Sequence, residues 1–174
     1  MRGCGNSRND YFQGVFLIKV LGIDPGTQRM GWGLIEIDEG KTSLIDSGVY
    51  RPKKIDRIER LVEIHNYTLA LLKKFNPSVV AIEDTFFGKN PQSMIKLGEA
   101  RSSAMLAAAV SGIDVANFAP REIKMALVGN GNAAKEQVAF MVQTLIGAPQ
   151  GKPLNETDAI AVAFCWAQRA IRAR

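Results

Sequence analysis

The sequence predicts an α/β fold in which helices flank a mixed five-stranded sheet. Three observations support this class. A chain of 174 residues that is 47% apolar and 22% charged is long enough to bury one core and has the composition of an ordinary folded domain. Short apolar segments bounded by turn residues alternate with longer segments in which apolar residues recur at helical spacing. Along the chain their order is three strands, helix, strand, helix, strand and then further helices.

The first three predicted strands follow one another with only short turns between them. The first ends where the sequence turns polar, at Asp24-Pro25-Gly26, and residues 38–40 form the turn before the third. Successive strands joined by short turns pair as an antiparallel meander. The three strands are expected at residues 15–23, 32–37 and 43–50.

Helices and strands alternate in the rest of the chain. Strands that are joined through a helix are usually parallel neighbours, so the first and fourth strands are expected side by side. Their carboxyl ends carry Asp24 and Glu83, which would then be adjacent. The expected elements are a helix at 56–75, a strand at 79–83, a helix at 91–110, a strand at 113–118, and helices at 121–127, at 133–146 and from about 156.

The charge balance favours a polyanionic partner. Lys and Arg outnumber Asp and Glu by 22 to 17, which gives a formal charge of +5 and a pI of about 9.4. Such an excess favours nucleic acid because binding releases condensed counterions. Cys4 and Cys165 lie far apart and outside any CxxC spacing, so neither a disulfide framework nor a zinc site is predicted. We expect a protein of the reducing cytoplasm.

The amino-terminal segment is expected to lie outside the fold. Residues 1–14 are mostly polar and lack the apolar run and the cleavage site of a secretion signal, so we interpret them as a loose tail or as an upstream start that the natural protein does not use. The longest apolar segment elsewhere, residues 104–110, is far shorter than the roughly 20 residues that cross a bilayer. No membrane span is predicted.

Three acidic residues are candidates for chemistry. Asp24 is exposed by the turn that follows it, and Glu83 ends an apolar strand, where a carboxylate needs a cation or a solvated cleft. Asn155 and Asp158 share one face at the start of the last helix. Carboxylates suit Mg²⁺ or Mn²⁺ in the company of water and phosphate oxygens.

Each of these residues also has a purely structural interpretation. Asp24 would then be only a turn residue, and Glu83 a solvated acid at a loop boundary. Asn155 would cap the last helix, with Asp158 completing a variant capping box. His65, the one histidine of the chain, is expected to be an ordinary helix residue without a catalytic role.

From residue 20 to about residue 168, the motifs together resemble those of the RuvC family of Holliday junction resolvases. In chain order they are Gly22-Ile23-Asp24-Pro25-Gly26, Ala81-Ile82-Glu83, Phe86-Phe87-Gly88-Lys89-Asn90, Lys96-Leu97-Gly98-Glu99-Ala100-Arg101, Ala119-Pro120-Arg121-Glu122-Ile123-Lys124, Val128-Gly129-Asn130-Gly131, Lys135 and Asp158-Ala159-Ile160-Ala161. The resemblance implies that residues 15–174 form a single nuclease domain of ribonuclease-H-like fold.

The resemblance also implies the catalytic residues and the metal. Asp24, Glu83 and Asp158 match three of the four acidic positions of the family, and Asn155 stands at the fourth, where relatives carry Asp or His. An amide oxygen brings no charge, so Asn155 is expected to be a weaker ligand. The implied cofactor is Mg²⁺, with Mn²⁺ as an alternative, at two ions per active site in a two-metal hydrolysis of a phosphodiester.

The implied partner is a four-way DNA junction, which the enzyme would resolve by paired cuts in homologous recombination and DNA repair. Phe86 would stack on an exposed base, and Lys89, Lys124 and Lys135 would contact phosphate. Two opposed cuts suit a homodimer, for which the helix at residues 91–110 is a candidate interface. Branch-migration proteins of the same pathway are further partners that the resemblance implies.

Three alternative functions stay open at this point. The first is a junction-binding protein that has weakened or lost cleavage because of Asn155. The second is an actin-like ATPase, because such enzymes share the motif at residues 22–26, although they need a second phosphate-binding half. The third is a ribonuclease from a related branch of the same fold, which would prefer RNA to branched DNA.

Overall fold

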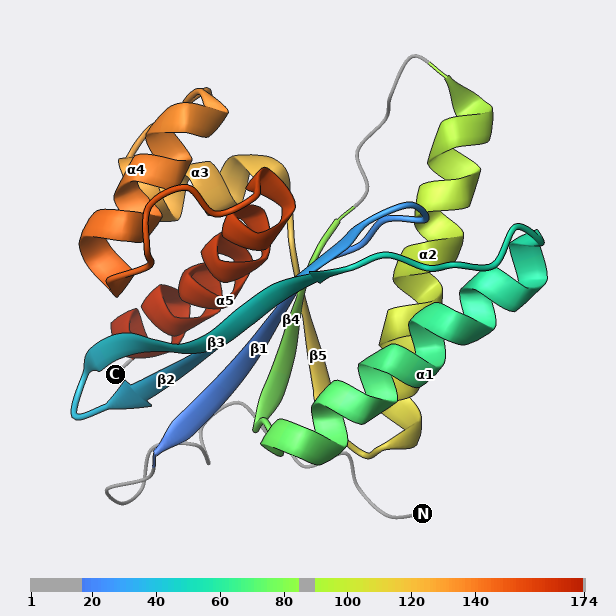
Figure 1. Ribbon diagram of the computed structural model, residues 1–174. Coiled ribbons are helices and arrows are strands. Elements are labelled where there is room, and N and C mark those ends of the chain that lie inside the picture. The colour runs from blue at the N-terminus through green and yellow to red at the C-terminus, as the bar shows by residue number, and fades with distance from the viewer. Residues whose placement is uncertain (1–16, 85–89, 174) are drawn as a thin grey trace, which may run out of the picture.

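Five strands form one mixed sheet in the order β3-β2-β1-β4-β5 (Figure 1). The computed structural model describes residues 17–84 and 90–173, so the predicted tail at residues 1–14 lies outside the described residues. The strands are β1 (Ile18–Asp24), β2 (Met30–Asp38), β3 (Lys41–Tyr50), β4 (Val79–Glu83) and β5 (Asp114–Phe118). The helices are α1 (Arg57–Phe75), α2 (Pro91–Val110), α3 (Pro120–Val128), α4 (Lys135–Ile146) and α5 (Leu154–Arg172).

The strand pairing confirms the predicted meander and the predicted neighbours. β1 is antiparallel to β2 and β2 to β3, whereas β4 is parallel to both β1 and β5. β2 and β3 extend beyond their predicted bounds because Asp38 pairs with Lys41. Only Glu39 and Gly40 then form the turn, both with positive φ, as a two-residue hairpin requires.

Two hydrophobic cores lie on opposite faces of the sheet. Ile18 and Val20 of β1 pack on the face that α3, α4 and α5 cover, while Leu21 and Ile23 pack on the face that α1 and α2 cover (Figure 1). The central strands are therefore apolar on both sides, which explains their uninterrupted apolar sequence. Within the described part of the chain, no helix has both the length and the apolarity needed to cross a bilayer.

Side chains that precede α1 and α2 mark where these helices begin. The Asp56 carboxylate accepts hydrogen bonds from the backbone N–H groups of Ile58 (2.8 Å) and Glu59 (2.9 Å). Asp56 therefore caps α1, whereas the sequence analysis had predicted it to be the first residue of the helix. Asn90 caps α2 in the same way, and Pro91 occupies its first turn as predicted.

Glycines allow α5 to lie directly against β1 and β2. A Cβ atom added at Gly22 would lie 2.0 Å from the carbonyl oxygen of Ala159, and one at Gly31 would lie 1.9 Å from that of Asn155. One at Gly33 would lie 2.5 Å from the side chain of Ile160. These approaches bring the first turn of α5 to the carboxyl end of β1, where Asp24 lies.

We expect Gly31→Ala to destabilise the protein. The added methyl group overlaps the backbone of α5, which has to shift outward, and overpacking of this kind costs about 1–3 kcal/mol or more. Gly98→Ala in α2 is the matched control, since nothing lies within 4 Å of its added Cβ and alanine is the better helix former. Urea unfolding of both variants measures the difference, and equal stability of the two would contradict the close contact.

Candidate active site

Asp24 and Glu83 lie at the carboxyl ends of neighbouring parallel strands. Ile23 of β1 pairs with Ile82 of β4, so the next residue on each strand is one of the two acids. Both side chains are directed to the face of the sheet that α5 covers. Side chains an even number of positions apart on a strand share a face, and Val20 of β1 and Ala81 of β4 pack in the core on that face. This confirms the predicted adjacency of the two strand ends.

The first turn of α5 brings Asn155 to Asp24. The Asn155 Nδ2 donates a hydrogen bond of 3.1 Å to the Oδ2 of Asp24. The interpretation of Asn155 as the helix cap is wrong, because α5 begins at Leu154 and Pro153 holds the capping position in extended conformation. Asn155 is therefore the second residue of the helix, and its side chain is directed to β1.

Asp158 lies one turn further along α5 and faces a lysine. Its Oδ2 accepts a hydrogen bond of 3.1 Å from the Nζ of Lys135, the first residue of α4. The Asp158 side chain is only 19% exposed, whereas that of Lys135 is 62% exposed. The charge of Asp158 raises the pKa of Asp24 and of Glu83. Acids from three separate segments thus lie close enough to interact electrostatically.

Burial raises the pKa of two of the acids, Asp24 and Glu83. Desolvation raises the pKa of Asp24 to about 6. The hydrogen bond from Asn155 and the charge of Lys135 lower this pKa, and the charge of Asp158 raises it. Desolvation also raises the pKa of Glu83 to about 7, helped by the charges of Asp24 and Asp158. The site therefore gathers negative charge where solvation is poor, which favours a cation as counterion.

Two of the four predicted DNA-contacting residues lie beside these acids. The pKa of Lys135 is raised, mainly by the negative charge of Asp158. The positive charge of Lys124 in α3 lowers the pKa of Glu83. Phe86 and Lys89 lie outside the described residues.

The donor chemistry of the site fits a hard divalent cation. Three carboxylates and an amide oxygen are the ligand types that Mg²⁺ and Mn²⁺ take. Among residues 17–84 and 90–173, however, no three His, Cys, Asp or Glu side chains lie close enough together to hold a metal ion as they stand. Lys135 and Asn155 each bond one carboxylate oxygen, the Oδ2 of Asp158 and the Oδ2 of Asp24.

Arg101 is a site residue to which the sequence assigned no role. From α2 its Nε donates to the backbone oxygen of Glu83 at 3.3 Å, and its Nη2 donates to the side chains of Asp84 and, at 2.7 Å, of Asn117. Arg101 thereby ties α2 to the ends of β4 and β5. The sequence feature that could have indicated Arg101 is a basic residue directly after Ala100, which is buried in α2.

Comparison with known proteins identifies the family. The family model for crossover junction endodeoxyribonuclease RuvC matches residues 20–166. The chain belongs to the RuvC family. The RuvC proteins of Rhodospirillum rubrum and Methylocella silvestris are 39% and 42% identical to it, over 86% and 90% of this chain and 89% and 90% of those relatives.

Solved structures agree with the RuvC assignment. Thermus thermophilus RuvC in complex with a Holliday junction substrate has a TM-score of 0.82 at 34% identity, covering 90% of this chain and 96% of that one. The yeast mitochondrial Holliday junction resolvase Ydc2 has a TM-score of 0.70 over 92% of this chain and 82% of that one. At 14% identity Ydc2 shows likeness of fold alone. The predicted ribonuclease-H-like fold is confirmed.

Membership of the RuvC family confirms the predicted enzyme class. The chain is a crossover junction endodeoxyribonuclease, a nuclease that hydrolyses phosphodiester bonds in four-way DNA junctions during recombination and repair. RuvC nucleases depend on divalent metal, in agreement with the donor chemistry of the site. The family match favours this enzyme over a binding protein without cleavage.

Replacing the Glu83 carboxylate with a neutral amide is expected to stabilise the protein when no divalent cation is bound. Because the pKa of Glu83 is raised from 4.5 to about 7 in the folded protein, its ionisation costs folding free energy as the pH rises through this window. The unfolding free energy of Glu83→Gln should exceed that of the wild type by about 1–3 kcal/mol above pH 7. Below about pH 4 this difference should vanish. Urea unfolding in EDTA across this pH range measures it.

Glu59→Gln is the matched control for this experiment. The Glu59 side chain is 58% exposed and pairs with Lys54 at 3.5 Å on the protein surface. Its loss should change the unfolding free energy by no more than about 0.5 kcal/mol at any pH. A Glu83→Gln protein less stable than the wild type at pH 8 would show that the buried carboxylate does not strain the fold.

Proposed function

We propose that Asp24, Glu83 and Asp158 hold two Mg²⁺ ions per active site, with Asn155 as a weaker ligand and with Mn²⁺ able to replace Mg²⁺. The single observation that carries this is the convergence of two strand ends and one helix turn, marked by the hydrogen bond from Asn155 to Asp24. When bound, divalent ions supply an activated water and neutralise charge on the phosphate and the leaving oxygen. The junction is cut by hydrolysis, without a covalent enzyme intermediate.

Asp24 holds the central place among the proposed ligands. It lies between Glu83 on the neighbouring strand and Asn155 on α5, so it is the residue best placed to be shared by two ions. Asn155 orients the Asp24 carboxylate through its amide N–H. A half-turn of the Asn155 amide about its terminal bond presents the carbonyl oxygen instead, which lets it become a neutral ligand.

Basic residues around the acids are proposed to hold the DNA backbone. Lys135 already bonds Asp158, and Lys124 acts electrostatically on Glu83, so phosphate bound by these lysines would lie next to the carboxylates. Phe86 is proposed to stack on an exposed junction base and Lys89 to contact phosphate. Thermus thermophilus RuvC has been solved in complex with such a junction.

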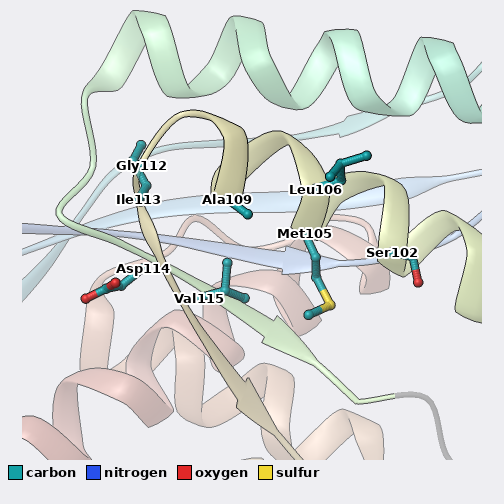
Figure 2. A pocket seen from close by; sticks show the side chains of 8 residues that line it. All are labelled: Ser102, Met105, Leu106, Ala109, Gly112, Ile113, Asp114 and Val115. Carbon is teal, nitrogen blue, oxygen red and sulfur yellow. The ribbon is translucent and has the colours of Figure 1, made fainter. Parts of the chain in front are cut away.

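We propose that the enzyme acts as a homodimer through α2 and the edge strand β5. Exposed apolar side chains of α2 include Ile95, Leu106 and Val110. A groove of about 600 Å³ that Leu106 lines together with Met105 and Val115 runs between α2 and β5 (Figure 2). We assign this face to a second copy of the chain. A nearly two-fold symmetric junction needs two opposed cuts, and a two-fold dimer uses the same surface of both subunits. A monomer at micromolar concentration in sedimentation analysis would contradict this arrangement.

Other features of the proposal follow from the family. Residues 15–174 are proposed to work as a single nuclease domain in the cytoplasm, with branch-migration proteins of the same pathway as partners. Neither the fold nor the family match favours the actin-like ATPase, and stoichiometric ATP binding would contradict the nuclease assignment. A ribonuclease would cleave RNA in preference to branched DNA.

Asp24→Asn is expected to abolish junction cleavage while retaining junction affinity. The substitution removes the shared metal ligand, and a loss of more than about 100-fold in the cleavage rate is expected. Junction affinity should stay within about threefold, because backbone contacts use lysines and not this carboxylate. Cleavage of a synthetic four-way junction in Mg²⁺ and Mn²⁺, with affinity measured in Ca²⁺, separates the two effects.

The control for this experiment is Asp38→Asn. Asp38 is exposed at the end of β2 that lies away from Asp24, since Ile37 pairs with Ile18 and Gly31 pairs with Asp24, so this substitution should change neither cleavage nor affinity. If Asp24→Asn lowered affinity as much as cleavage, the proposed division between metal chemistry and backbone binding would be wrong.

Asn155→Asp is expected to lower the Mg²⁺ concentration required for cleavage by about tenfold, because a fourth carboxylate strengthens a site for a hard cation. The same change removes an amide donor from Asp24 and places a second carboxylate beside it, so thermal stability in EDTA should fall. Cleavage against Mg²⁺ concentration and melting in EDTA measure these opposed effects. If only Asn155→Asp cuts in both Mg²⁺ and Mn²⁺, the wild type is a binding protein that has lost cleavage.

A further inference from the structure

A second polar cluster surrounds the first turn of α5. Glu156 is only 6% exposed, and its Oε1 accepts hydrogen bonds from the Ser47 Oγ at 2.6 Å and from the Lys152 Nζ. The Lys152 Nζ also donates to the Ser47 Oγ at 2.9 Å. The three side chains, which we call the Glu156 cluster, thus form a closed triangle of contacts between β3, the segment before α5 and α5 itself.

The Glu156 cluster is poorly explained as a source of stability. Removing a carboxylate and an ammonium group from water costs solvation that their attraction repays only in part, so apolar residues of similar size often stabilise a fold equally well. What a buried and fully paired cluster can supply is a defined geometry, because its partners bond in only one arrangement. In this protein the cluster joins the first turn of α5 to β3, so the geometry that it defines is the position of that turn.

An irregularity in β3 directs Ser47 to this cluster. Ile35 pairs with Leu44 and Leu34 pairs with Asp46, so Ile45 is an extra residue that bulges from the ladder. Without this residue the alternation that places Leu44 on the α5 face would place Asp46 there. With it, Ser47 faces α5 and meets Glu156.

Apolar side chains of α5 join the core from Ile160 onward. In the turn before them, Leu154 is exposed and the buried side chains are the polar Glu156 and Thr157. The atoms of this turn nearest to Gly31 are backbone atoms of Asn155, so apolar packing contributes little to its setting. Polar contacts on either side of the helix then decide its setting, with the bond from Asn155 to Asp24 on one side and the Glu156 cluster on the other.

We infer that Glu156, Lys152 and Ser47 are positioning residues that set the first turn of α5 and thereby the placement of Asn155 and Asp158. The inference rests on the proposed function of Asp158 as a metal ligand. Glu156 itself is not among the proposed ligands, because its carboxylate bonds Ser47 of β3, whereas the proposed ligands converge at the ends of β1 and β4. Its effect on metal binding passes through the helix backbone.

The test replaces the ion pair with apolar residues of similar length. The double variant Glu156→Met with Lys152→Met is expected to melt within a few degrees of the wild type but to bind Mn²⁺ about tenfold more weakly. Mn²⁺ binding to the full chain, without DNA, is followed by electron paramagnetic resonance. Ser47→Ala removes one hydroxyl and should weaken Mn²⁺ binding about threefold, which keeps the inference testable if the double variant does not fold. Lys152→Arg retains the ion pair and should retain affinity.

Two controls separate this inference from the proposed function. Asp38→Asn removes an exposed carboxylate at the end of β2 that lies away from Asp24 and should leave Mn²⁺ affinity unchanged. Asp158→Asn should weaken Mn²⁺ binding strongly in an otherwise wild-type chain, and if it does not, the proposed metal site itself is wrong. If Asp158→Asn weakens binding but the double Met and Ser47→Ala variants bind as tightly as the wild type, the positioning role is wrong. Affinity losses that follow the melting temperature across all variants would also overturn it.

Discussion

The first turn of α5 lies against the glycines of β1 and β2, and the placement of every site residue on that helix depends on this contact. A side chain at Gly22 or Gly31 would occupy the space of the helix backbone. Because no Cβ intervenes, the polypeptide brings Asn155 within hydrogen-bonding distance of Asp24 across more than a hundred residues of sequence. The same contact lets Asp158 add its charge to the two acids at the strand ends. A bulkier interface would separate the helix from the strands that carry the other half of the site.

The gathering of acids opposes stability and favours function. Desolvation raises the pKa of both Asp24 and Glu83 well above their ordinary values, which means that the folded protein holds these charges at a cost in folding free energy. Lys135 offsets part of the cost by pairing with Asp158. A divalent cation would offset more of it, because binding to the folded state alone stabilises that state. The poor solvation that weakens the fold is thus the property that makes the site attract a cation.

Asn155 supplies an amide at a position where the resemblance to the family predicts an acid. A neutral amide in place of a carboxylate lowers the negative charge of the site and adds a donor that Asp24 accepts. Part of the electrostatic repulsion among the acids is thereby avoided, at the expense of one charged ligand. Arg101 on the other side of the sheet has a comparable supporting role, since it bonds the backbone of Glu83 and the side chains of Asp84, just after β4, and of Asn117 in β5.

Local pattern in the sequence determined the elements and their order, and with them the neighbouring strand ends that carry Asp24 and Glu83. The bounds of β4 and α2 were predicted to the residue, because Pro91 and the apolar run of β4 are signals within a few positions of the element they define. Only the tertiary structure decided that Asn155 bonds Asp24 instead of capping α5, that a bulge at Ile45 turns Ser47 inward, and that Glu156 is buried in an ion pair. Helix and strand periodicity follow from residues close together in sequence, whereas the bond between Asn155 and Asp24 and the bond between Ser47 and Glu156 join residues more than a hundred positions apart. The geometry of these contacts exists only once the sheet and α5 have packed.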